Sequence, residues 1–140
     1  MLVEDNPADA ELIRQGFQEC DVSCNLHVAG DGREALDFLH RKGQYAKSPR
    51  PAVILLDLNM PKMNGFEVLE EVKRDEFLRG IPVVMFTTSE LEEDIAKAYE
   101  YGANTFLTKP TDFDELLRTL EDFGRYWRNA KLVTTQPVGT

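Results

Sequence analysis

The chain is poor in the residues that build disulfide frameworks and zinc sites. It has 2 cysteines and 2 histidines among 140 residues. Cys20 and Cys24 are close in sequence, but neither His27 nor His40 completes a zinc-type spacing with them. We therefore interpret both cysteines as ordinary thiols and both histidines as structural residues.

Long apolar runs and an excess of basic residues are also missing. No run approaches the roughly 20 apolar residues of a transmembrane helix. The start of the chain lacks the basic and apolar regions of a signal peptide. Acidic residues outnumber basic ones 25 to 16, giving a net charge of −9, whereas a nucleic-acid-binding surface would be basic. We expect a protein of the reducing cytoplasm with no membrane and no nucleic-acid partner.

What the chain does contain is a regular alternation of short apolar runs with amphipathic stretches. The runs 53–56 and 83–86 are continuously apolar, which is typical of parallel strands covered on both faces. The pattern predicts an α/β fold: a five-stranded parallel sheet, doubly wound as (βα)5. For this sheet we expect the flavodoxin-like strand order 2-1-3-4-5, one of the two common doubly wound orders. The expected strands are Met1–Val3, Asn25–Ala29, Ala52–Leu56, Pro82–Phe86 and Asn104–Leu107.

Capping residues indicate where the five helices begin. A side-chain acceptor, in one case followed by proline, precedes each amphipathic stretch, as at helix N-termini. The polar, proline-containing stretch 43–51 is expected to be an exposed loop. We expect one domain over residues 1–130 and a C-terminal tail over 131–140. The expected capping segments are Asn6–Asp9, Asp31–Glu34, Asn64–Glu67, Ser89–Glu92 and Thr111–Asp114.

Polar side chains follow four of the expected strands, at the edge where ligands bind in open α/β sheets. Crowded carboxylates repel one another unless a cation binds, and Mg²⁺ prefers oxygen ligands. Asp is an established phosphoryl acceptor, and a lysine can hold a phosphoryl oxygen. Each residue alone is typical of an ordinary cap or ion pair, but together they predict phosphoryl transfer by positioning and charge neutralisation. The residues are Glu4 and Asp5, Asp57, Thr87 and Lys109.

Motifs at these strand ends resemble the receiver domains of two-component response regulators, over roughly residues 1–125. They are Glu4-Asp5-Asn6, Leu55-Leu56-Asp57-Leu58 followed by Met60-Pro61 and Asn64-Gly65, Phe86-Thr87-Thr88, and Thr108-Lys109-Pro110. The start 4–9, the insertion 43–51 and the run 87–89 look like the subgroup that serves phytochrome photoreceptor kinases.

The resemblance implies a phosphoacceptor and a metal site. Asp57 would receive the phosphoryl group from a kinase phosphohistidine, and would later lose it, so we expect no enzyme in the sense of turnover on other substrates. Mg²⁺ would be held by Asp5 and Asp57, with Glu4 nearby, and by the backbone carbonyl of Asn59. Glu4 departs from the aspartate that many family members carry, and its longer side chain reaches further.

The resemblance also implies a conformational switch. Lys109 would pair first with Asp57 and then with the phosphoryl group, while the hydroxyl of Thr87 would move to the phosphate. Phe106 stands at the position of the switch aromatic, where it lacks a tyrosine hydroxyl. The Lys109-Pro110 bond is a candidate for a cis peptide.

The partners implied by the resemblance are a sensor histidine kinase, with a phytochrome as the subgroup's candidate, or a phosphotransfer protein. We expect no output domain after the last helix, and we therefore expect output through contact with an unknown downstream protein. Aromatic residues at exposed helix ends suit an interface. We expect a homodimer through the fourth helix, fifth strand and fifth helix. Its candidate residues are Leu91, Ile95, Tyr99, Phe123, Tyr126 and Trp127.

Three other functions remain alternatives. An aspartyl-phosphate-type hydrolase would need a general acid two residues after its nucleophile, where this chain has Asn59, and an inserted cap domain. A pseudo-receiver that binds without phosphorylation would not need the acidic set together with Lys109. A flavodoxin-like cofactor binder would need a glycine-rich phosphate loop after the first strand, where the chain is acidic.

Overall fold

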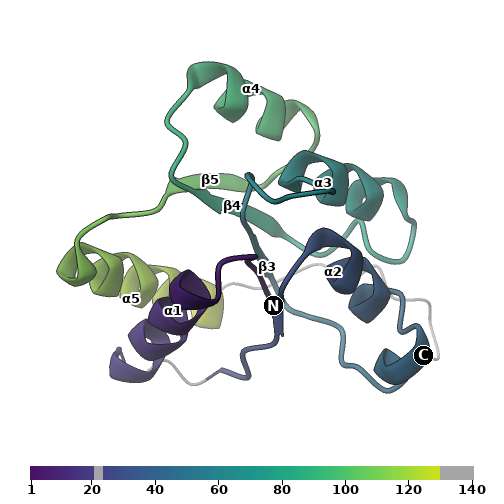
Figure 1. The fold of residues 1–140 in the computed structure, drawn as a ribbon, viewed down its shortest axis with the longest axis horizontal. Coiled ribbons are helices and arrows are strands. Elements are labelled where there is room, and N and C mark those ends of the chain that lie inside the picture. The colour runs from purple at the N-terminus through teal and green to yellow at the C-terminus, as the bar shows by residue number, and fades with distance from the viewer. Residues whose placement is uncertain (21–23, 130–140) are drawn as a thin grey trace.

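The computed structural model describes residues 1–20 and 24–129, and the expected tail 131–140 lies outside this range. Within these two ranges, five strands and five α-helices alternate (Figure 1), as the sequence predicts. The strands are β1 (Leu2–Val3), β2 (Val28–Ala29), β3 (Ile54–Leu56), β4 (Val83–Thr87) and β5 (Thr105–Thr108). The α-helices are α1 (Pro7–Glu19), α2 (Gly32–Leu39), α3 (Gly65–Arg74), α4 (Glu92–Glu100) and α5 (Phe113–Asn129).

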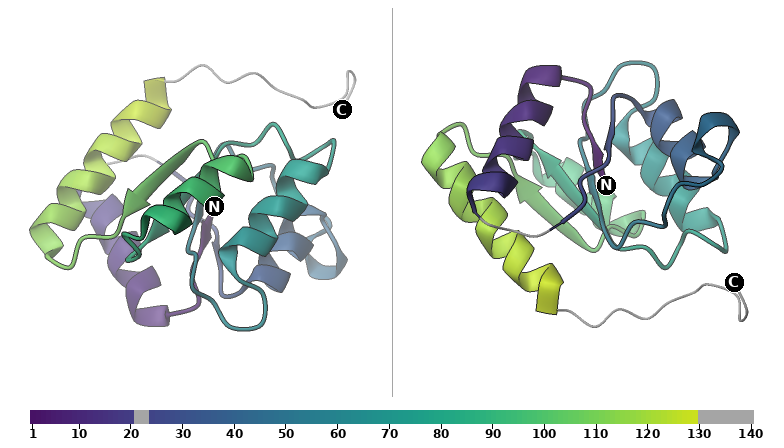
Figure 2. Two further views of the ribbon diagram at one scale, coloured as in Figure 1. Left: turned by 90° about the horizontal axis from the view of Figure 1, so that it is seen from above. Right: turned by 90° about the horizontal axis from the view of Figure 1, so that it is seen from below.

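The strands form one parallel sheet in the order β2-β1-β3-β4-β5, which confirms the predicted topology. Helices α1 and α5 cover one face, and α2, α3 and α4 cover the other (Figures 1 and 2). None of the helices in the described ranges is long and apolar enough to span a bilayer.

Two apolar layers lie on the two faces of the sheet because successive strand residues point to opposite sides. Leu55, Val84 and Phe86 pack with α1 and α5 in one layer. Leu56 and Met85 pack with α2 and α3 in the other. All five of these side chains are buried, so the central strands are held from both faces and can fix the residues that follow them.

Four of the five helix caps form as predicted. The side chains of Asn6, Asp31, Asn64 and Asp112 each accept a hydrogen bond from a backbone N–H in the first turn of the helix that follows. The prediction for α4 is wrong in detail. Leu91, which makes no side-chain cap, is the N-cap residue, and Ser89 lies further back in the loop.

The stretch 43–51 is mostly exposed, as predicted, but it contains a 3₁₀ helix, η1 (Gly43–Tyr45). Tyr45 packs against the core on the α2 side, and its hydroxyl donates a hydrogen bond of 2.9 Å to Glu34 Oε1. The insertion is therefore tied to the start of α2 by one side chain.

Candidate functional site

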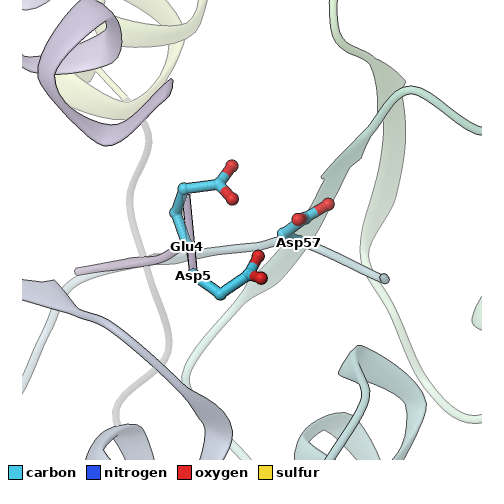
Figure 3. Close-up of side chains that lie close together, drawn as sticks. All are labelled: Glu4, Asp5 and Asp57. Carbon is cyan, nitrogen blue, oxygen red and sulfur yellow. The ribbon is translucent and has the colours of Figure 1, made fainter. Parts of the chain in front are cut away.

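Three carboxylates gather at the carboxyl edge of the sheet because β1 and β3 are neighbours. Val3 pairs with Leu56, so the residues that follow, Glu4 and Asp57, also lie side by side, and Asp5 comes next. One ligand oxygen from each of Glu4, Asp5 and Asp57 lies within 4.8 Å of the others. Figure 3 shows the Asp5 carboxylate reaching toward that of Asp57, with Glu4 beside them. Such a set of hard oxygen donors suits a divalent cation.

Asp57 is largely withdrawn from solvent, with 8% of its surface exposed. Its Oδ1 atom accepts a hydrogen bond of 2.9 Å from the backbone N–H of Leu58, and Lys109 Nζ lies 3.7 Å from the same oxygen. The carboxylate is thus oriented by its own loop and by one cation.

Lys109 is the cation of the site and contacts three acids. Its Nζ forms an ion pair with Glu4 Oε1 and lies 3.7 Å from Asp57 Oδ1 and 3.8 Å from Asp9 Oδ2. Its backbone N–H donates to the carbonyl of Thr87 at 2.7 Å, which fixes the end of β5 against β4. The sequence predicted Lys109 here, but gave Asp9 only as part of a helix cap.

Burial and charge together shift the pKa values of the two buried carboxyls. Burial raises the pKa of Glu4 to about 7, against the opposing effect of Lys109, and the negative charge of Asp57 adds to the rise. Burial also raises the pKa of Asp57, and Lys109 again opposes the shift. One lysine does not compensate for this many acids, so the cluster gains from a further cation.

The residues expected to form the switch lie around this cluster. Thr87, at the end of β4, is fully buried, and its Oγ1 accepts a hydrogen bond of 3.3 Å from the N–H of Ser89. Phe106 is half-buried on β5 and packs against the core on the α3 side. Asn59 lies exposed in the loop after β3. All the peptide bonds of the described residues are trans, so the prediction of a cis Lys109-Pro110 bond is wrong; trans is the lower-energy form even before proline.

The candidate interface residues fall into two groups. Leu91, Tyr99 and Tyr126 expose half or more of their surface, at 57%, 50% and 64%. Ile95, Phe123 and Trp127 are half-buried, and the last two pack against the core between α1 and α5. Sequence reasoning missed one contact in this region: the hydroxyl of Tyr99 accepts a hydrogen bond from the backbone N–H of Phe106 at 3.2 Å.

Known proteins share both the sequence and the arrangement of this chain. Residues 1–121 match the response regulator receiver domain family. The curated protein Response regulator Rcp1 of Synechocystis sp. is 40% identical over 127 residues, which cover 91% of this chain and 86% of that protein.

Solved structures of response regulators have the same fold as this chain. The crystal structure of the Mn²⁺-bound form of response regulator Rcp1 matches with a TM-score of 0.86 at 39% identity, over 95% of this chain and 96% of that one. The crystal structure of the phosphorylated cyanobacterial phytochrome response regulator RcpA matches with a TM-score of 0.89 at 40% identity, over the same shares of 95% and 96%. On fold, sequence and the acidic cluster at the sheet edge, this chain belongs to the response regulator receiver family.

Proposed function

We propose that this protein is a response regulator that accepts a phosphoryl group on Asp57 and signals by changing its surface. The observation that carries the proposal is the cluster of Glu4, Asp5 and Asp57 with Lys109 in contact, built from the ends of three strands. Phosphoryl transfer to a carboxylate needs a positioned nucleophile and positive charge beside it. Asp57 is the positioned carboxylate, Lys109 is the cation, and Glu4 and Asp5 are acids that could bind a metal ion.

The transfer is a displacement at phosphorus. A carboxylate oxygen of Asp57 attacks the phosphorus atom of a kinase phosphohistidine, and the P–N bond breaks as the new P–O bond forms. The electron pair of the broken bond returns to the imidazole nitrogen, which takes up a proton from solvent. Lys109 stands 3.7 Å from Asp57 and would neutralise charge on the transferred oxygens.

Glu4, Asp5, Asp57 and the backbone carbonyl of Asn59 would hold Mg²⁺. When bound, the ion would neutralise part of the negative charge of the carboxylates and of the transferred phosphoryl group. The similar Rcp1 was solved in a Mn²⁺-bound form, which supports a divalent cation in this protein as well. The hydroxyl of Thr87 would move to the phosphoryl group, and the ring of Phe106 on β5 would change its position as part of the switch.

We infer that the phosphoryl donor is a sensor histidine kinase of the phytochrome type, acting directly or through a phosphotransfer protein. The similarity to RcpA, a cyanobacterial phytochrome response regulator, supports this choice. Cys20 and Cys24 are free thiols, which fits the cytoplasm in which we place the protein. The output would be a contact with a downstream protein, or a homodimer through α4, β5 and α5.

The test is labelling with acetyl phosphate and Mg²⁺, followed by intact mass measurement. One added phosphoryl group is expected on the wild-type protein and on Asp122→Asn, a control whose exposed carboxylate lies on α5. No adduct is expected on Asp57→Asn or after chelation of the metal. Labelling that survives Asp57→Asn would reject Asp57 as the acceptor, and repeated turnover of phosphomonoesters would favour the hydrolase alternative.

A second experiment tests the choice of kinase. A phytochrome histidine kinase labelled on its histidine should transfer its phosphoryl group to this protein faster than an unrelated histidine kinase does. Equal transfer from both kinases would remove the phytochrome part of the proposal and leave the acceptor chemistry standing.

A further inference from the structure

Helix α4 is attached to the molecule by very few buried side chains. Ala98 is its single buried residue, whereas α3 buries five, including Phe66, Val68 and Leu69. It lies over β5 at the far end of the sheet (Figure 1). Few buried contacts favour local opening, so individual polar contacts matter more for the position of α4 than for that of α3.

One of these contacts is made to the free edge of β5. Among the described residues, β4 is the one strand that pairs with β5, which lies at the edge of the sheet. The backbone N–H groups of β5 point alternately toward β4 and away from it. The N–H of Lys109 points inward to the carbonyl of Thr87. The N–H of Phe106, three positions earlier, points outward and donates to the hydroxyl of Tyr99 at 3.2 Å.

The same strand ends in the candidate phosphorylation site. Lys109, directly after β5, pairs with Glu4 and lies near Asp57. The strand therefore carries the lysine of the site at one end and the Tyr99 contact in its middle, with no intervening loop. A second link runs through the loop after β4: Ser89 donates its N–H to Thr87 Oγ1 and its hydroxyl to Asp94 Oδ2, at 3.3 and 2.6 Å.

We propose that Tyr99 is a positioning residue that couples phosphoryl transfer at Asp57 to the position of α4. Its hydroxyl holds α4 on Phe106 while Lys109 is engaged by Glu4, and the contact is released when Lys109 turns to the phosphoryl group. This inference rests on the proposed function, because it needs Asp57 to be the acceptor.

The physical reason is a competition for Lys109. A phosphoryl group adds about −1.5 to −2 charges beside Asp57 and offers strong acceptor oxygens, so it draws the ammonium group away from Glu4. A shift of the lysine moves the end of β5. At 3.2 Å the Tyr99 hydrogen bond is already at the long end of the usual range of about 2.7–3.2 Å, so a small shift of β5 is enough to break it. Coupling between two sites is reciprocal: if phosphorylation breaks the Tyr99 contact, then removing that contact must favour the phosphorylated conformation.

The first test compares Tyr99→Phe with Tyr101→Phe. Each variant loses one hydroxyl and keeps its ring, and the described residues offer no hydrogen bond to the hydroxyl of Tyr101. We expect acetyl phosphate and Mg²⁺ to label Tyr99→Phe about threefold to tenfold faster than wild type, the range of one net hydrogen bond. Tyr101→Phe should match wild type. Equal or slower labelling of Tyr99→Phe would overturn the inference, even if its melting temperature falls.

The second test follows hydrogen exchange at the amide of Phe106 by NMR. In the wild-type protein, exchange of this amide should accelerate on phosphorylation; in Tyr99→Phe it should be fast both before and after. An amide of Phe106 that stays equally protected in phosphorylated wild type contradicts the release of the contact. If the wild-type protein takes up no phosphoryl group at all, the proposed function fails, and the inference fails with it. Normal labelling with no difference between the variants rejects the coupling alone.

Discussion

At the scale of single residues, the site is a balance between burial and charge. Glu4 and Asp57 are both buried carboxyls, and Lys109 is the cation that lies against both. Burial outweighs the lysine at Glu4, whose pKa rises from the ordinary 4.5 to about 7. The folded protein without metal therefore prefers a proton on Glu4 at a pH where the unfolded chain has lost it.

This shift predicts that the metal-free protein loses stability as the pH rises from about 4.5 to 7. The folded state binds the proton more tightly than the unfolded state, so the contribution is complete below the unfolded pKa and is lost as pH passes the folded pKa. At about 1.4 kcal/mol per pKa unit, the loss is roughly 3 kcal/mol at most. Urea unfolding in EDTA at several pH values measures it.

The matching variant is Glu4→Gln, which cannot ionise. Its free energy of unfolding should fall less steeply with pH than that of wild type over the same interval, while Glu90→Gln, on an exposed loop position, should follow wild type. Parallel pH curves for wild type and Glu4→Gln would contradict the raised pKa.

Much of this site was predictable from the sequence, and the reason is topological. Residues directly after parallel strands must meet at one edge, so Glu4, Asp57 and Lys109 could be placed together before their contacts were known. Asp9 and Tyr99 could not, because both act from helices. Whether a helical side chain reaches a neighbouring strand depends on the packing of the helix, which a pattern of residue types does not fix.

At the scale of elements, the junction between β3 and α3 is the tightest point near the site. A Cβ atom on Gly65 would lie 2.4 Å from the carbonyl oxygen of Asp57 and 2.9 Å from the Cα of Leu58. Both neighbours are backbone atoms, and the N–H of Gly65 donates to the carbonyl of Leu58 at 2.8 Å. Helix α3 can begin this close to the loop that carries Asp57 only because residue 65 lacks a side chain.

The change Gly65→Ala is therefore expected to cost about 1–3 kcal/mol of stability, as overpacking does in well-packed regions, and to weaken Mg²⁺ binding by displacing Asp57. Thermal unfolding and a magnesium titration measure the two effects. Gly43→Ala is the control for the steric effect, because a Cβ atom at Gly43 meets nothing within 4 Å. Its φ of +54° adds some backbone strain in that variant. A Gly65→Ala protein with wild-type stability and magnesium affinity would contradict the close contact.

Element boundaries were less predictable than element order. The observed strands β2 and β3 are shorter than the expected runs. A residue counts as part of a strand only where its backbone pairs with a neighbouring strand, whereas an apolar run can extend beyond the paired residues. Ser89 was predicted to cap α4, but its hydroxyl donates to Asp94 and its N–H donates to Thr87, and Leu91 is the N-cap residue instead. In this loop Ser89 therefore links Thr87 to Asp94 and does not cap α4.

At the scale of the whole molecule, exposed apolar side chains gather at the α4 end of the sheet and at the end of α5. Leu91 and Tyr99 belong to the α4 region and Tyr126 to α5, and each exposes half or more of its surface. A stable interface needs roughly 800 Å² from each partner, with large apolar or aromatic side chains near its centre. These three residues supply such anchors, and we predict that they support the proposed homodimer.

The change Leu91→Glu should weaken this dimer at least about tenfold, because it places an unpaired charge in a surface that must be desolvated. The control is Phe77→Glu, which replaces another large apolar side chain, 50% exposed, in the turn after α3. Sedimentation over a range of concentrations, with and without acetyl phosphate and Mg²⁺, measures the association. Phe77→Glu should associate as wild type does. A mass that stays monomeric at every concentration in both conditions would reject the homodimer.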